Sequence, residues 1–129
     1  MKKFILVLLL CIGLVGCVSS LEKTRTRNRG NLLKLSVGMT KQQVVEIMGT
    51  GSAGGRFGET RVNNPYKSEI IQPGATQYEV LYYYTDLDSV IYSANPSFIT
   101  DKDLTPLIFD DGILIGWGKE FLKTKQTKN

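Results

Sequence analysis

The sequence predicts an α+β fold in which two short N-terminal helices pack on a three- to four-stranded antiparallel sheet. Three observations lead to this prediction. A capped amphipathic helix pattern lies in the first half of the chain, the second half is rich in β-branched and aromatic residues, and an Asp-Gly pair separates two apolar runs near the end. The chain has 129 residues, and one globular domain is expected over residues 31–122.

The amino terminus has the pattern of a bacterial lipoprotein signal. A cationic start, Met1–Lys3, precedes an apolar run over residues 4–15, which is shorter than the roughly 20 residues that cross a bilayer as a helix. The sequence Leu14-Val15-Gly16-Cys17 resembles a lipobox. This resemblance implies that residues 1–16 are a cleaved signal peptide and that Cys17 carries a covalent lipid. The alternative is an ordinary signal peptide followed by a chance cysteine.

A lipid on Cys17 would hold the protein on a membrane without a spanning helix. Val18 follows the cysteine, and by resemblance to enterobacterial lipoproteins an Asp at this position would retain the protein in the inner membrane. The sequence therefore predicts a location on the periplasmic face of the outer membrane. Nucleic acid is not expected as a partner, because an exported and anchored protein does not meet it.

Residues 17–30 are predicted to be the lipidated cysteine and a flexible basic tether, because the stretch has few apolar residues and neither a helical nor a strand period. Fully extended, Val18–Gly30 would reach about 43 Å. A soluble linker is one interpretation. The other is contact with anionic headgroups, where each cation contributes on the order of 1 kcal/mol, through Lys23, Arg25, Arg27 and Arg29.

Charge is concentrated at the two ends of the chain. Removal of residues 1–16 would lower the net charge from +4 to +2, with 14 basic and 12 acidic residues left. The body from 30 to 118 holds six basic and ten acidic residues, whereas the segments on either side of it are basic. Residues 123–129 are predicted to be a basic C-terminal tail.

Two helices are predicted at the start of the domain. The first is short, over 31–35. The second covers 41–48, with Thr40 as its N-cap and Gln43 at the position that completes a capping box. Gly49 suits the end of this helix. Its apolar face, at helical spacing, is formed by Val44, Ile47 and Met48.

The segment after the second helix, residues 49–58, holds five glycines. It lacks the GxxxxGK[ST] order of a phosphate-binding loop, and it follows a helix instead of preceding one. A mobile connector is therefore predicted there, without nucleotide binding.

Strands are predicted in the second half of the chain. One region lies within Glu59–Ile71 and is broken near Asn64-Pro65. A turn at Gln72-Pro73-Gly74 leads to the next strand, Tyr78–Thr85, which is rich in tyrosine.

The run Leu107–Trp117 is predicted to be a hairpin whose two-residue turn is Asp111-Gly112. This turn sets the register of the two strands. The expected pairs are Asp110 with Ile113, Phe109 with Leu114, Ile108 with Ile115, and Leu107 with Gly116.

Strand alternation places large apolar groups on both faces of the sheet. Two short helices can cover only one face, so the other is predicted to be an exposed partner-binding surface. Its residues are expected to be Tyr78, Tyr82, Tyr84, Ile108, Ile115 and Trp117. The alternative is that the segment 86–104 folds over this face.

Two segments carry a family resemblance. The phrase LSVGMTKQQVVEIMGT resembles the helical signature of the BamE (SmpA/OmlA) family of small outer-membrane lipoproteins. The segment LTPLIFDDGILIGWG is more similar to a sister family of uncharacterised γ-proteobacterial lipoproteins. The resemblance implies an ααβββ fold and an accessory role of the kind BamE has in the β-barrel assembly machine. The tyrosine strand, the 86–104 insertion and the GWG ending depart from BamE's pattern.

The composition argues against catalysis. The chain has no histidine, which excludes Ser-His-Asp and Cys-His mechanisms and histidine-ligated metals. Cys11 lies in the signal segment, so processing would leave only the lipidated Cys17. Turn formation explains the acidic residues between 86 and 111, which lack calcium-loop spacing and show no glycosidase pair. We expect no enzymatic activity, no metal and no cofactor apart from the covalent lipid.

These observations predict a lipid-anchored periplasmic accessory or scaffold protein of the outer membrane. Its expected partners are the membrane and another envelope protein, contacted during envelope or β-barrel protein assembly. The alternative is a module that binds peptidoglycan, by stacking of Trp117 and the tyrosines on sugar rings, or anionic lipid.

Overall fold

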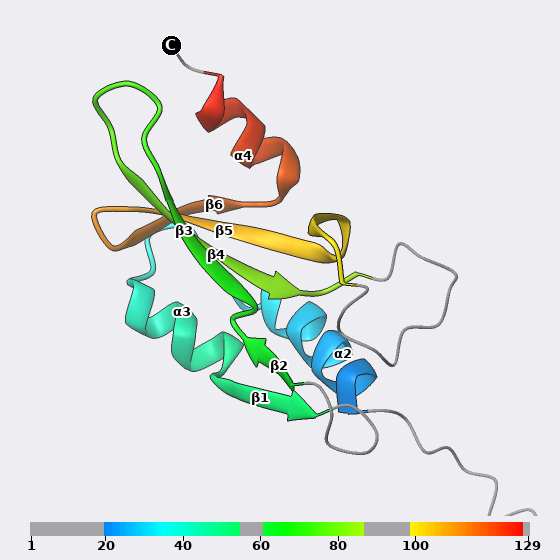
Figure 1. Cartoon of the computed structure of the whole chain (residues 1–129). Coiled ribbons are helices and arrows are strands. Elements are labelled where there is room, and N and C mark those ends of the chain that lie inside the picture. Colours follow the sequence, from blue (N-terminus) through cyan, green and yellow to red (C-terminus); the bar gives the residue numbers. More distant parts are fainter. Residues whose placement is uncertain (1–19, 55–60, 87–98, 128–129) are drawn as a thin grey trace, which may run out of the picture.

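The computed structural model describes residues 20–54, 61–86 and 99–127 (Figure 1). The elements in chain order are helices α2 (Ser20–Leu32) and α3 (Lys41–Met48), strands β1 (Gly51–Gly54), β2 (Arg61–Asn64), β3 (Lys67–Ile71) and β4 (Tyr78–Tyr84), the 3-10 helix η3 (Asp101–Asp103), strands β5 (Leu104–Asp110) and β6 (Ile113–Trp117), and helix α4 (Lys119–Gln126). The predicted α+β class is confirmed.

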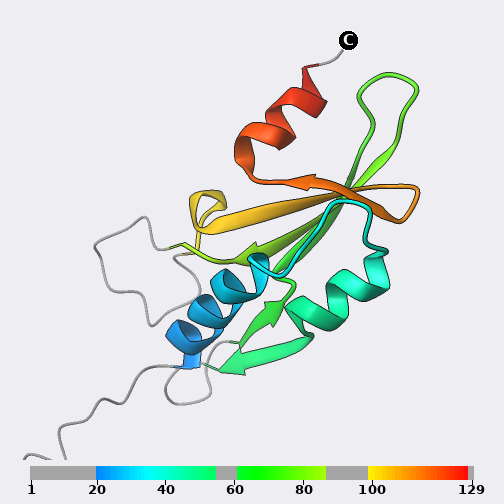
Figure 2. The ribbon, with the colours of Figure 1, turned by 180° about the vertical axis from the view of Figure 1, so that it is seen from behind.

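The main sheet is antiparallel and has the strand order β3-β4-β5-β6, while β1 and β2 form a separate two-stranded sheet. Helix α4 lies on one side of the main sheet, and α2, α3 and the β1–β2 pair lie on the other (Figures 1 and 2). Alternation along β4 divides the buried side chains between two apolar clusters. Leu81 and Tyr83 belong to the cluster that α3 covers, and Val80, Tyr82 and Tyr84 belong to the second cluster.

Helix α3 forms as its sequence predicts. The Thr40 hydroxyl accepts a hydrogen bond from the Gln43 backbone N–H at 3.2 Å, and the Gln43 side chain accepts one from the Thr40 N–H at 2.9 Å. Val44 and Met48 are buried against the sheet. The predicted capping box and apolar face are therefore confirmed.

The predicted flexible tether is wrong from Ser20 onward, because this stretch is helix α2 and packs on the body. Its inward face is mostly polar, which hides the helical period. The buried residues of this face are Leu21, Thr24, Asn28 and Asn31. The prediction of a separate short helix over 31–35 is also wrong, because residues 31 and 32 belong to α2, which ends at Leu32.

A reciprocal amide pair joins α2 to the body. Asn28 Nδ2 donates to Asn64 Oδ1 at 2.9 Å, and Asn64 Nδ2 donates to Asn28 Oδ1 at 3.1 Å. Asn28 also donates to the Tyr84 carbonyl at 2.9 Å, and Asn64 donates to the Met48 carbonyl at 3.0 Å. Two asparagines thus connect α2, α3, β2 and β4 by bonds that a search for apolar residues does not detect.

The predicted break at Asn64-Pro65 is confirmed, because it separates β2 from β3. The glycine-rich segment was predicted to be a connector without regular structure. Its described part contains β1, whose Gly51–Gly54 pairs with β2. Glycine weakens a strand, so the pattern gave no strand signal there.

The β5–β6 hairpin confirms the predicted turn, with φ of 47° at Asp111 and 75° at Gly112, as a type I′ turn requires. The first two predicted pairs, Asp110–Ile113 and Phe109–Leu114, are also confirmed. A β-bulge then shifts the register, so that the next pairs are Ile108 with Gly116 and Leu107 with Trp117. The bulge turns Trp117 to the α3 side, contrary to the prediction.

The C-terminal boundary is also corrected. The predicted tail begins inside α4, which continues to Gln126. Phe121 and Leu122 of this helix pack against the second cluster. A Cβ atom on Gly116 would lie 2.6 Å from the Phe121 ring, so the glycine is what allows α4 to approach β6.

Candidate functional site

The predicted partner surface is not exposed. Tyr82, Tyr84 and Ile108 are buried, while Tyr78 and Ile115 are half-buried at the margin of the same cluster. The bulge places Trp117 on the opposite side of the sheet. Side chains from α2, β2, β5 and α4 pack in the same cluster, and they are Leu21, Val62, Leu104, Phe121 and Leu122.

The alternative prediction, that the segment 86–104 folds over this face, is confirmed only for the end of the segment. Ile99 and Leu104, at the end of that segment, pack in the second cluster. Residues 87–98 lie outside the described part of the chain. Phe121 and Leu122 of α4 also pack there, and only the last four residues of this helix had been predicted to belong to the tail.

A groove runs between α4 and the edge of the sheet at β3, with a volume of about 430 Å³. We call it the α4–β3 groove. Helix α4 lines one wall with residues of one helical face, and β3 lines the other through alternate residues. Further lining residues come from β4, η3 and β5. The lining residues are Lys67, Glu69, Tyr82, Asp101, Lys102, Leu104, Pro106, Lys119, Leu122, Lys123 and Gln126.

Both carboxylates in this groove are bonded internally. The Tyr82 hydroxyl donates to Glu69, and burial together with this bond raises the pKa of Tyr82. Lys67 Nζ lies 2.7 Å from Asp101 Oδ1 and 4.5 Å from the centroid of the Tyr82 ring. Glu69 and Asp101 therefore face groups of the protein itself.

The lysines on the opposite wall leave the groove positively charged. Lys119 donates to the Lys102 carbonyl, a bond that does not neutralise the ammonium group. Lys123 pairs with Glu120 at 2.9 Å, but both side chains are mostly exposed, so water screens this pair strongly. The two carboxylates that line the groove are bonded to Tyr82 and Lys67, so the positive charges of Lys119 and Lys123 favour an anionic occupant.

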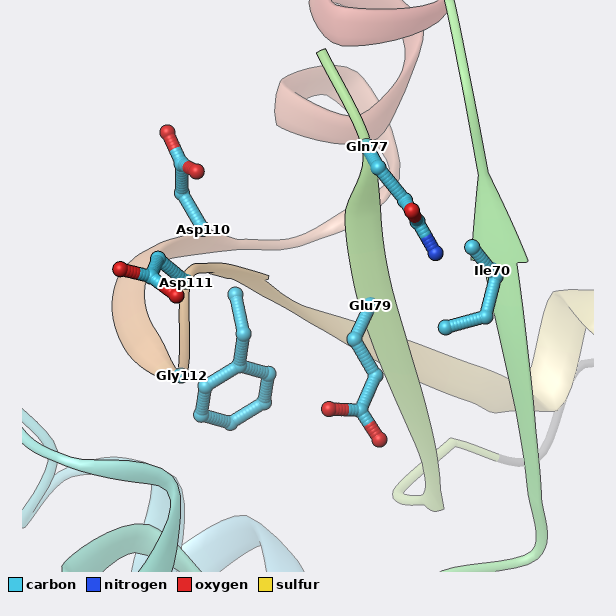
Figure 3. A pocket seen from close by; sticks show the side chains of 7 residues that line it. Ile70, Gln77, Glu79, Asp110, Asp111 and Gly112 are labelled. Atoms are coloured by element: carbon cyan, nitrogen blue, oxygen red, sulfur yellow. The ribbon is translucent and has the colours of Figure 1, made fainter.

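A second hollow, of about 340 Å³, lies on the α3 side of the same edge and is shown in Figure 3. We call it the Ile70 hollow. Its lining residues are Ile70, Gln77, Glu79, Phe109, Asp110, Asp111 and Gly112. Glu79 is paired with Lys41 at 2.6 Å, and Figure 3 shows the three carboxylates pointing in different directions. They do not form the paired arrangement that acid–base chemistry needs.

The other acidic residues are also separated from one another. Asp103 accepts a hydrogen bond from the Thr100 N–H at 2.8 Å and so caps η3, while Asp101 pairs with Lys67. Across residues 20–54, 61–86 and 99–127, no three acidic or cysteine side chains gather where they could hold a metal ion. Asp88 lies outside these ranges.

The four predicted lipid-contact residues all lie on α2, but they differ in exposure. Lys23, Arg27 and Arg29 are exposed. Arg25 is half-buried, and its Nε donates to Glu22 at 2.9 Å. This bond lowers the pKa of Glu22 and raises that of Arg25.

Cys17, the predicted lipidation site, lies outside the described residues. Only Val18 and Ser19 stand between it and the first residue of α2. A stretch of three residue steps spans about 10 Å, compared with about 43 Å for the tether that the sequence predicted.

Apart from Tyr82, the residues that line the α4–β3 groove were not predicted from the sequence. One available signal was the alternation of Lys67 and Glu69 on β3. The other was the placement of Phe121 and Leu122 among lysines, which is the pattern of a surface helix. What the sequence could not show is that β3 and α4 lie next to each other.

The described helices include no candidate membrane span. Comparison with curated proteins and with solved structures finds no significant match. A family model described as a protein of unknown function (DUF3192) matches residues 17–124. The match covers most of the chain, including all strands of the two sheets, helices α2 and α3, and the first six residues of α4. This chain therefore belongs to the DUF3192 family.

Proposed function

We propose that this protein is a lipid-anchored accessory protein on the periplasmic face of the outer membrane, where it binds another envelope protein. The carrying observation is that α2, which packs into the body, begins three residues after Cys17. A lipid at Cys17 would hold the folded domain against the membrane surface instead of at the end of a long tether.

The resemblance to the BamE family supports the same role. It rests on the α3 signature, whose capping box forms as the pattern requires. We also propose that the protein acts by binding other molecules and does not catalyse a reaction. The missing histidine and the diverging carboxylates of the Ile70 hollow support this part.

The anchor is tested by metabolic labelling with a fatty-acid analogue, followed by separation of inner and outer membranes. The wild-type protein should be labelled and should sediment with outer membranes, whereas Cys17→Ser should lose the label. A labelled, membrane-bound Cys17→Ser protein would contradict the proposal. Cys11→Ser is the matched control and should behave as wild type, because Cys11 precedes the cleavage position.

The binding function is tested by purification from detergent-solubilised membranes. A second envelope protein should be recovered in a fixed ratio to the wild-type chain. Recovery of no protein in such a ratio, combined with sedimentation on purified peptidoglycan, would favour the cell-wall alternative. The structure gives that alternative less support than the sequence did, since Tyr82 and Tyr84 are buried and cannot stack on a sugar.

Contact with anionic lipid is a second candidate, favoured by the exposed cations of α2. Thr26 lies on the same exposed surface, so an environment-sensitive label on Thr26→Cys would report on the contact. In vesicles with anionic lipid, this label should be shielded from an aqueous quencher. The combined substitution Lys23→Glu, Arg27→Glu and Arg29→Glu should remove the shielding. A label on Gln42→Cys in α3 serves as the control.

A further inference from the structure

Among the residues that the structure describes, no second strand pairs with the outer edge of β3. In the main sheet, β3 and β6 are the two outer strands. The start of β6 is occupied by the segment before α3, with bonds of 2.8 Å from Gly38 N–H to the Leu114 carbonyl and from Leu114 N–H to the Met39 carbonyl. Within the described ranges, β3 pairs only with β4. Alternate backbone groups of β3 therefore point away from the sheet and can accept another strand.

The side chains of β3 favour the pairing of this edge with another strand. Soluble proteins usually protect an open edge with outward charges, a bulge or a covering segment. Here Ile70 is 58% exposed, while the charged Lys67 and Glu69 turn toward the α4–β3 groove and are bonded there. An exposed aliphatic residue on an open edge favours pairing.

Hollows lie on both faces of this same edge. The α4–β3 groove adjoins Lys67 and Glu69 on the α4 side, and the Ile70 hollow adjoins Ile70 on the α3 side. Successive side chains of a strand point to opposite faces. A strand added beside β3 would therefore direct its side chains alternately toward the groove and toward the Ile70 hollow.

We propose that β3 binds an extended acidic segment of another envelope protein, which joins the sheet as an additional strand. The lysine excess of the α4–β3 groove selects acidic side chains on that face. The Ile70 hollow is lined by three carboxylates, which disfavour acidic side chains at the alternate positions of the segment. This inference rests on the proposed function, since it identifies the surface through which the partner is bound.

The binding is tested with a fluorescent peptide of alternating glutamate and threonine and with the lipid-anchored protein in detergent. The peptide should bind at least tenfold more tightly than one of alternating lysine and threonine. Its binding should slow the hydrogen exchange of backbone amides in Lys67–Ile71. Absence of binding, or binding without protection of these amides, would overturn the proposal.

Two variants locate the binding surface. Lys119→Glu with Lys123→Glu should weaken peptide binding at least tenfold, because both residues line the α4 wall. Ile70→Glu should also weaken it at least tenfold. Ile113→Glu is the matched control, since Ile113 is 38% exposed on the opposite edge, and it should change binding by less than twofold. Equal effects of the two isoleucine substitutions would exclude β3 as the binding strand.

A second copy of this chain is the competing occupant. If the protein dimerises with the same protection of β3 and the dimer excludes the peptide, the edge serves self-association and the proposal is wrong. Purification of the partner from membranes distinguishes failure of this inference from failure of the proposed function. Undiminished recovery of that partner with Ile70→Glu would overturn the use of β3 and leave the accessory role intact.

Discussion

At the scale of single residues, the three consecutive tyrosines of β4 differ in their hydrogen bonding. The Tyr82 hydroxyl donates to Glu69. The Tyr83 hydroxyl is buried, and no described residue offers it a hydrogen-bond partner. A buried polar group without a partner costs about 1–3 kcal/mol, so Tyr83 is a site of lost stability in the core.

We therefore expect opposite effects from two identical substitutions. Tyr83→Phe should raise the free energy of unfolding by about 1 kcal/mol, because it removes a desolvated hydroxyl and keeps the ring. Tyr82→Phe should lower it by about 1–2 kcal/mol, because it removes a bond to a carboxylate. Urea unfolding measures both. A loss of stability with Tyr83→Phe would mean that the hydroxyl has a partner.

The same tyrosines predict loss of stability at alkaline pH. Burial raises the pKa of Tyr83 from 10.0 to about 12, and it raises the pKa values of Tyr82 and Tyr84 as well. Above pH 10 the unfolded chain has released these protons while the folded chain retains them, so the free energy of unfolding falls as pH rises.

For Tyr83 this fall should occur between pH 10 and about 12, with a slope of at most about 1.4 kcal/mol per pH unit. Urea midpoints measured from pH 8 to pH 11.5 should decline less steeply in Tyr83→Phe than in the wild type. Parallel curves for the two proteins would contradict the assignment.

At the scale of elements, polar bonds attach α2 to the body. Asn28→Ala leaves the Asn64 amide and the Tyr84 carbonyl without one of their partners, and it should lower the free energy of unfolding by about 1–3 kcal/mol. Hydrogen exchange in α2 should accelerate in parallel. The exposed neighbour Arg27→Ala should change stability by no more than about 0.5 kcal/mol. If the two variants behave alike, the amide pair does not hold the helix.

Helix α4 depends on a contact that only glycine allows. Gly116→Ala would push the Phe121 ring away and should lower the free energy of unfolding by about 1–3 kcal/mol. Gly30→Ala is the contrast, because Gly30 lies in exposed helix with no atom within 4 Å of an added Cβ. It should raise stability by about 0.5–1 kcal/mol. Urea unfolding of both variants checks the difference in sign.

At the scale of the whole molecule, the proposed lipid on Cys17 would hold the domain close to the membrane, because only two residues separate Cys17 from α2. Insertion of twelve Gly/Ser residues between Ser19 and Ser20 should leave the unfolding midpoint unchanged, since the insertion lies outside the packed helix. A flexible linker of this length has a root-mean-square span of about 20 Å. Quencher shielding of a label on Thr26→Cys should therefore decrease in anionic vesicles, and unchanged shielding would contradict the close placement.

Patterns that repeat over a few residues were predicted correctly. Thr40 and Gln43 cap α3, Asp111-Gly112 forms the hairpin turn, and alternation along β4 separates Val80 from Leu81. Each pattern acts through bonds or geometry within a few residues, so the local sequence contains the required information.

The remaining features depend on contacts between distant segments. Helix α2 has only one buried leucine, and its packing relies on Asn28 meeting Asn64, which lies 36 residues away. The bulge that moves Trp117 to the other face accompanies the close approach of α4 to Gly116. The α4–β3 groove exists only because α4 packs against the same face as Lys67 and Glu69.

The sequence alone was therefore sufficient for the α+β class, the capped helix, the hairpin turn and the expectation of a lipid on Cys17. The tertiary structure decided that the tyrosine face is buried, that the predicted tether is a packed helix from Ser20 onward, and that β3 pairs only with β4 among the described residues. The physical reason is that local bonds are encoded by neighbouring residues. Burial and edge exposure instead depend on which distant segments compete to cover the same surface.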